Sequence, residues 1–305
     1  MQNLLQSIAP EDVSPALLIL GAFVSIILIA GVICDIIILI RLRRRPVNIP
    51  DMTARLLTTQ WTLTDAGTVL LAIAVVAAFF ALYAMFLRFS GFAVTTEYTE
   101  AVSTLVETLS YQIVALATIV GIMNSKGLSW REAFGIERAR LATNIRLGAF
   151  FYLATMPIFV FVSLIYDVVL NFFGFSVEQQ EILSILINPS LPCWLQITLM
   201  LLAIAAAPMI EEFLFRGIVM PAVTRRYSLP VAVCLVSFAF AVIHFHAAAL
   251  LPLFVIAVAF SSGYLYSGSI IVPITMHMFF NGVTVVIYLM SKDAPIDTLG
   301  FLHLW

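Results

Sequence analysis

Residues 194–220 read WLQITLMLLAIAAAPMIEEFLFRGIVM, an apolar run that contains two adjacent acids, Glu211 and Glu212, and one arginine, Arg216. The run is long enough to cross a hydrocarbon core of about 30 Å, for which a helix needs about 20 residues. A charged side chain at the centre of such a helix costs about 2.5–3.5 kcal/mol on insertion scales, so charges there usually mark a working site. The stretch therefore predicts a membrane helix that carries functional groups.

The whole chain has the composition of a membrane protein. Hydrophobic residues make up 62% of its 305 residues, charged residues make up 10%, and the mean hydropathy is +1.08. A soluble core of this length does not need so much apolar surface. Apolar runs of about spanning length lie at residues 16–40, 65–88, 104–123, 147–170, 194–220, 229–247, 249–266 and 270–290. We predict an all-α, polytopic membrane protein whose roughly eight transmembrane helices enclose an intramembrane cavity.

The charged residues are distributed unevenly between the two ends of these helices. With eight spans, the basic residues of one side are Arg41, Arg43, Arg44, Arg45, Arg55, Lys126, Arg131, Arg138, Arg140, Arg146, Arg225 and Arg226. The positive-inside rule makes that side cytoplasmic. The opposite loops are acidic and lie with both termini, which are therefore predicted to be non-cytoplasmic. We place this integral, multi-pass protein in the plasma membrane of a bacterium.

No soluble module is expected beside the membrane helices. The longest polar stretches, at about 41–64 and 124–146, are too short for an independent core, so residues 1–305 are predicted to form a single membrane domain. A serine nucleophile is not indicated, because no Gly-x-Ser-x-Gly elbow is present. The three cysteines, Cys34, Cys193 and Cys234, are odd in number and lack polar activating neighbours.

The two acids of the opening stretch differ in their relation to the arginine. Glu212 and Arg216 are four residues apart, so on a helix they share a face and are expected to pair, which lowers the cost of burying both. Glu211 is rotated from its neighbour by about 100° and is left free of that pair. We therefore predict that Glu212 and Arg216 are structural and that Glu211 faces the reacting group.

Two later apolar runs carry further polar residues at the spacing of one helical turn. His244 follows Phe240 by four residues, and Asn281 follows His277 by four, so each pair is expected to share a helix face. His246 is about 200° away from His244 on a helix, and we assign it to the membrane interface. The three runs thus predict one interior site that contains carboxylate, imidazole and amide groups.

These motifs resemble those of the CPBP family, which comprises CAAX prenyl proteases and bacteriocin-processing intramembrane proteases and is also known as the ABI family. The resemblance consists of Glu-Glu-x3-Arg, Phe-x3-His and His-x3-Asn, in this order on three polar-bearing runs. It covers about residues 195–290, which we take as the catalytic core. The earlier spans match only in being hydrophobic.

The resemblance implies an intramembrane endopeptidase that admits the membrane-proximal or C-terminal tail of a membrane-associated or prenylated, CAAX-like substrate. In that picture Glu211 activates a water with the help of His244, and the water attacks the scissile carbonyl. His277 and Asn281 would then hold the oxyanion. The site is expected to open toward the cytoplasm.

The requirement for a cofactor is left open by the sequence. The family has also been described as zinc-dependent, and Glu211, His244 and His277 could supply three ligands with one open position. The chain has no His-Glu-x2-His pair on one helix, which would be the stronger zinc signal. Either no cofactor or zinc is therefore compatible with the motifs.

Two functions of other classes use the same residues. A proton-coupled transporter could employ Glu211, His244 and His277 as a relay, but it would predict inverted repeats and broken helices, which the sequence does not display. A non-catalytic bacteriocin-immunity or binding factor could also use this fold. The expected partners are the lipid bilayer and a membrane-bound or lipidated substrate, and no nucleic acid is expected. Asp35 and Asp167 receive no role, and the oligomeric state is not indicated.

Overall fold

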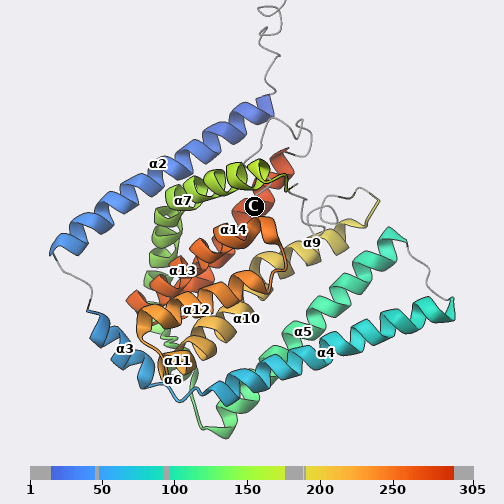
Figure 1. Cartoon of the computed structure of the whole chain (residues 1–305), viewed down its shortest axis with the longest axis horizontal. Coiled ribbons are helices and arrows are strands. Elements are labelled where there is room, and N and C mark those ends of the chain that lie inside the picture. The colour runs from blue at the N-terminus through green and yellow to red at the C-terminus, as the bar shows by residue number, and fades with distance from the viewer. Residues whose placement is uncertain (1–14, 45–47, 92–95, 176–187, 189, 292–305) are drawn as a thin grey trace, which may run out of the picture.

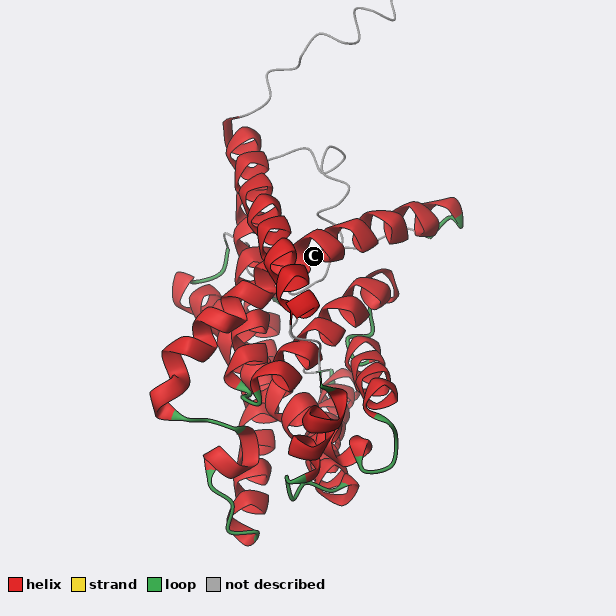
Figure 2. Cartoon of the chain, turned by 90° about the vertical axis from the view of Figure 1, so that its left-hand side faces the viewer, coloured by secondary structure: helices red, strands yellow, loops and turns green. Residues whose placement is uncertain are grey.

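The computed structural model describes residues 15–44, 48–91, 96–175, 188 and 190–291, and every element in these ranges is helical (Figures 1 and 2). The predicted positions of the two termini and most of the acidic loop residues fall outside the described residues. The α-helices are α2 (Pro15–Arg44), α3 (Ile49–Leu57), α4 (Leu63–Ser90), α5 (Glu97–Ser125), α6 (Trp130–Phe134), α7 (Leu141–Phe172), α9 (Cys193–Leu201), α10 (Ala207–Glu212), α11 (Met220–Thr224), α12 (Leu229–Val242), α13 (Leu250–Ser267) and α14 (Ile271–Ser291).

The predicted all-α membrane architecture is confirmed. Seven helices within the described residues are long and apolar enough to cross a membrane, and one of them runs without interruption through α9, α10 and α11, from Cys193 to Thr224. The eighth predicted run is the shorter apolar helix α12. The chain is therefore an integral, multi-pass membrane protein.

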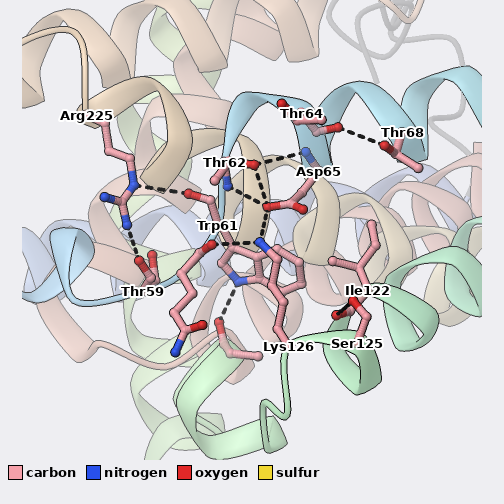
Figure 3. A network of polar contacts seen from close by, with 12 residues as sticks. Thr59, Trp61, Thr62, Thr64, Asp65, Thr68, Ile122, Ser125, Lys126 and Arg225 are labelled. Carbon is pink, nitrogen blue, oxygen red and sulfur yellow. Dashed lines mark hydrogen bonds and ion pairs between the residues drawn. The ribbon is translucent and has the colours of Figure 1, made fainter.

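The polar connections on the predicted cytoplasmic side meet at one end of the bundle. Lys126, after α5, forms an ion pair with Asp65 on α4 and donates a hydrogen bond of 2.8 Å to the Gln60 carbonyl (Figure 3). Arg225, after α11, donates to the carbonyls of Trp61 and Thr59. Three basic segments that are distant in sequence thus converge, as the positive-inside argument requires, while the orientation itself remains a prediction.

The short helix α6 docks on the helix that carries the two glutamates. Phe134 of α6 is completely buried, and its ring centroid lies 4.6 Å from that of Phe213 and 5.6 Å from that of Trp61. A Cβ atom added to Gly217 would lie 2.5 Å from the Phe134 ring. The polar stretch 124–146 therefore contributes an aromatic residue to the core, which its charge pattern does not predict.

Helix α7 lies between α2 and α14 (Figure 1) and fixes the position of α14. A Cβ atom on Gly148 of α7 would lie 2.6 Å from the Cβ of Thr275 and 2.8 Å from the Val272 carbonyl oxygen. At Gly31 of α2, an added Cβ would lie 2.6 Å from a ring carbon of Pro157. Glycine is required at both crossings because the backbones approach each other closely.

Candidate functional site

Glu211 and Glu212 end α10 and lie between two π-helical segments, Leu202–Ala206 and Phe213–Val219. A π turn widens the helix and leaves backbone carbonyls without their usual partners, and such turns are frequent at functional sites. Glu212 is completely buried, whereas the side chain of Glu211 is 29% exposed. Of the two acids, only Glu211 can be reached from outside the protein.

The predicted pairing of Glu212 with Arg216 is present. Arg216 Nη1 lies 2.8 Å from Glu212 Oε1, and both side chains are completely buried. The guanidinium also donates a 2.9 Å hydrogen bond to the Ala257 carbonyl and lies over the rings of Phe240 and Phe260, at 4.6 and 5.3 Å. The arginine is thus compensated by a carboxylate, a carbonyl and two aromatic faces, which a buried cation requires.

His277 lies between the two acids. Its Nδ1 is 3.0 Å from Glu212 Oε1, and its Nε2 is 3.9 Å from Glu211 Oε2. Because an ionised carboxylate only accepts hydrogen bonds, Nδ1 carries a proton and Nε2 is the nitrogen that faces Glu211. The ring stacks on Phe260 at 4.8 Å between centroids and meets Phe240 edge-on at 5.7 Å.

His244 lies in a turn and contacts Phe240, and its predicted place within a helix is wrong. The run 229–247 was expected to be helical throughout, but α12 ends at Val242 and His244 follows it. Phe245 adopts a positive φ of 50°, which ends the helix. His244 Nδ1 donates a 2.7 Å hydrogen bond to the Phe240 carbonyl, and its ring lies 4.8 Å from the Phe240 ring. This histidine therefore also presents Nε2, and it is exposed.

Asn281 points one of its amide hydrogens toward the helix of the glutamates. Its Nδ2 donates a 2.8 Å hydrogen bond to the carbonyl of Ala203, within the first π-helical segment. The side-chain amide retains a second N–H and the Oδ1 acceptor. The predicted contact of Asn281 with an oxyanion remains a prediction.

The arrangement of the side chains does not form a zinc site of the predicted composition. The described part of the chain contains no group of three or more His, Cys, Asp or Glu side chains that could hold a metal ion. Glu211, His244 and His277 are therefore not gathered as a ligand set. Nδ1 of His277 is paired with Glu212, which leaves Nε2 as the ring nitrogen available to a further partner.

Helix α13 contributes contacts that the motifs do not single out. Ser261 Oγ lies 3.5 Å from Arg216 Nε and 3.5 Å from Ser237 Oγ on α12. Phe260 and the Ala257 carbonyl complete the surroundings of Arg216 and His277. The small residues of α13 are the sequence feature that could have indicated these contacts. Serines in membrane helices usually donate to the backbone of their own helix, as Ser261 does to the Ala257 carbonyl at 3.0 Å, so this feature does not identify a site.

Two cavities of the structure lie apart from this cluster. One of about 440 Å³ is formed by α2, α3, α7, α12 and α13, and another of about 210 Å³ by α3, α6 and α13. None of the six predicted site residues lines either of them. The predicted catalytic cavity around the cluster therefore remains a prediction.

Residues 193–283 match the family model described as Rce1-like, Type II CAAX prenyl endopeptidase Rce1-like. The matched segment contains all six predicted site residues, and the match confirms the resemblance stated from the motifs. No curated protein and no solved structure matches the chain. The family that this segment matches is one of CAAX-type endopeptidases, and the match covers less than half of the chain.

Proposed function

We propose that the chain hydrolyses a peptide bond in the membrane-proximal or C-terminal tail of a membrane-associated or prenylated substrate, and that Glu211 activates the water. The proposal rests on the different surroundings of the two glutamates. Glu212 is buried and paired with Arg216, whereas Glu211 is partly exposed and faces His277 Nε2 at 3.9 Å. Of the two acids, only Glu211 has a partly exposed side chain and no ion pair with an arginine, and its buried Oε2 has no hydrogen-bond partner.

Glu211 and His277 face each other without a direct hydrogen bond. A distance of 3.9 Å is too long for one, and Glu211 Oε2 is buried and has no hydrogen-bond partner among the described residues. In the proposal, the two side chains separate when the substrate binds and admit one water between them. In the proposed step, Glu211 takes a proton from this water while the water oxygen attacks the carbonyl carbon. The proton then passes to the amide nitrogen as the carbon–nitrogen bond breaks.

Glu212 and Arg216 act in this proposal as positioning residues. The carboxylate of Glu212 accepts the Nδ1–H of His277 and so orients Nε2 toward the reacting groups. Asn281 offers its second amide N–H to the oxyanion, and His277 can donate as well only when Nε2 carries a proton in addition to Nδ1. His244 presents its Nε2 from the adjacent turn and assists Glu211.

The test is hydrolysis of a fluorogenic farnesylated CAAX peptide by the detergent-purified chain. We expect Glu211→Gln to abolish cleavage, because the amide cannot accept the proton. The matched control is Glu107→Gln, which removes another intramembrane carboxylate whose partner is Tyr111, on a helix that carries none of the six residues. Equal activity of wild type and Glu211→Gln would refute the assignment of the base.

A chelator in the same assay separates the two versions of the chemistry. We expect cleavage to continue in the presence of the chelator, since the proposed step uses the carboxylate of Glu211 as the base and no metal ion. Loss of activity with recovery on adding zinc would refute that version. If the wild type does not cleave the peptide, membrane-peptide proteomics of cells with wild type or Glu211→Gln tests other substrates, and identical profiles would favour a transporter or a binding factor.

A further inference from the structure

The cavity of about 440 Å³ lies within the range of about 300–1,000 Å³ that small-ligand sites occupy. Its walls come from the end of α2, the start of α7, the start of α12 and the end of α13, with α3 beside them (Figure 1). The ends of α2, α7 and α12 adjoin the basic connections. The lining is almost entirely apolar, with Phe150, Phe151, Val233 and Tyr266 among its side chains.

Arg41 is the cationic residue among the side chains that line this cavity. Arg41 of α2 lines the cavity, and its guanidinium carbon lies 5.9 Å from the centroid of the Phe150 ring. Within the described ranges Arg41 forms no ion pair, in contrast to Arg216 and Lys126. Arg43 and Arg44 follow in the same last turn of α2 but do not line the cavity. The cavity therefore has an apolar interior and an exposed positive group that has no carboxylate partner among the described residues.

The cavity shares two walls with the buried cluster. Ser262 lines the cavity, and the adjacent Ser261 lies 3.5 Å from Arg216 Nε. On α12, Cys234 lines the cavity one turn before the buried Ser237, which faces Ser261. The cavity and the proposed active site are thus separate, but the same two helices border both.

We propose that this cavity binds an anionic glycerophospholipid, with an acyl chain against its apolar wall and the phosphate paired with Arg41. An acyl chain matches the apolar lining, and each buried methylene contributes about 0.8 kcal/mol. A phosphate supplies the anion that Arg41 lacks, through charge-assisted hydrogen bonds. Anionic lipids are enriched in the cytoplasmic leaflet, on the side where the positive-inside rule places these arginines.

The first test counts bound lipids by native mass spectrometry of the full chain in detergent. Phosphatidylglycerol and phosphatidylcholine with identical acyl chains are compared for wild type, Arg41→Gln and Arg43→Gln. We expect wild type and Arg43→Gln to retain phosphatidylglycerol in preference, and Arg41→Gln to lose about tenfold in affinity, the effect of one charge-assisted contact. Equal retention of the two lipids by the wild type, or equal losses in both variants, would overturn the proposal.

A second readout locates the lipid without reference to activity. Cys234 lines the cavity and is exposed, while Cys193 is exposed on α9, away from the cavity, and serves as the internal standard. We expect phosphatidylglycerol to slow alkylation of Cys234 relative to Cys193 by several-fold in wild type and not in Arg41→Gln. Unchanged labelling of Cys234 would show that the lipid binds elsewhere. Because neither assay measures hydrolysis, the lipid site and the peptidase can fail independently.

Discussion

Replacement of Arg216 by methionine isolates the energetic role of the buried ion pair. Arg216 and Glu212 are both completely buried, and their contact of 2.8 Å joins two helical turns of the segment that carries Glu211. Methionine keeps the apolar stem of the side chain and removes the charge. The carboxylate of Glu212 then retains only the Nδ1–H of His277, because its Oε2 has no hydrogen-bond partner.

The expected loss follows from the charge that is left behind. Removing one partner of a buried pair costs about 3–5 kcal/mol, since the other charge stays buried without compensation. The Glu212→Gln variant should cost a similar amount, because the buried guanidinium then has no negative charge beside it and keeps only neutral acceptors, namely the new amide oxygen and the Ala257 and Ser261 oxygens, and two ring faces. The double variant removes both charges and should cost less than either single change, with a coupling energy of at least about 3 kcal/mol.

The free energy of unfolding of the four proteins can be measured by titration with sodium dodecyl sulfate in mixed micelles, followed by circular dichroism. Additive losses in the double variant would refute the reasoning, because they would mean that the two charges are stabilised independently. A loss below about 1 kcal/mol for Arg216→Met would do the same, since such values are typical of exposed pairs.

Two further outcomes can be checked in the same micelles. Gly217→Ala should destabilise by about 1–3 kcal/mol, because the new Cβ would lie 2.5 Å from the buried ring of Phe134; the control Gly67→Ala meets nothing within 4 Å and should stabilise by about 0.5–1 kcal/mol, so equal effects would contradict the packing argument. Hydrogen bonds from the Ser129 hydroxyl and backbone N–H hold the pKa of Glu132 below its ordinary value of 4.5. Because the folded pKa is the lower one, this stabilisation is present above about 4.5 and is lost as the pH falls through the folded value. Between about pH 6 and about pH 3, the unfolding temperature of wild type should therefore fall further than that of Glu132→Gln, and parallel curves would contradict this cap.

The central contacts of the site follow from spacing alone. Residues four apart on a helix share a face whether or not the rest of the fold is known, so Glu212 and Arg216 were predicted to pair, and they do. The cost of burying polar groups in an apolar layer predicts that these residues and His277 share one interior site, whereas the direct contact of Glu212 with His277, 65 residues away, was not predicted. Helical periodicity and burial cost are local properties of the sequence, which is why this part could be predicted.

The parts that the sequence did not predict depend on tertiary contacts. The two π-helical segments beside α10 have the apolar composition that an α-helix would also have, so composition does not distinguish them. In the first segment, the Ala203 carbonyl accepts a hydrogen bond from Asn281 on α14, which is distant in sequence. The burial of Phe134 depends on the space left by Gly217, a match between two segments that neither reveals separately. The end of α12 at Val242 lies within a continuous apolar run, so hydropathy extends the helix too far.

That early end of α12 bears on how water reaches an apolar site. A helix of 14 residues is about 21 Å long, which is less than the roughly 30 Å of the hydrocarbon core. Since α12 starts beside the basic connections, His244 is expected to lie within the apolar layer. Non-helical backbone at that depth is tolerated only where protein buries it or water reaches it, and His244 is exposed. An entrance for water beside His244 would meet this condition, and hydrolysis by Glu211 requires such an entrance.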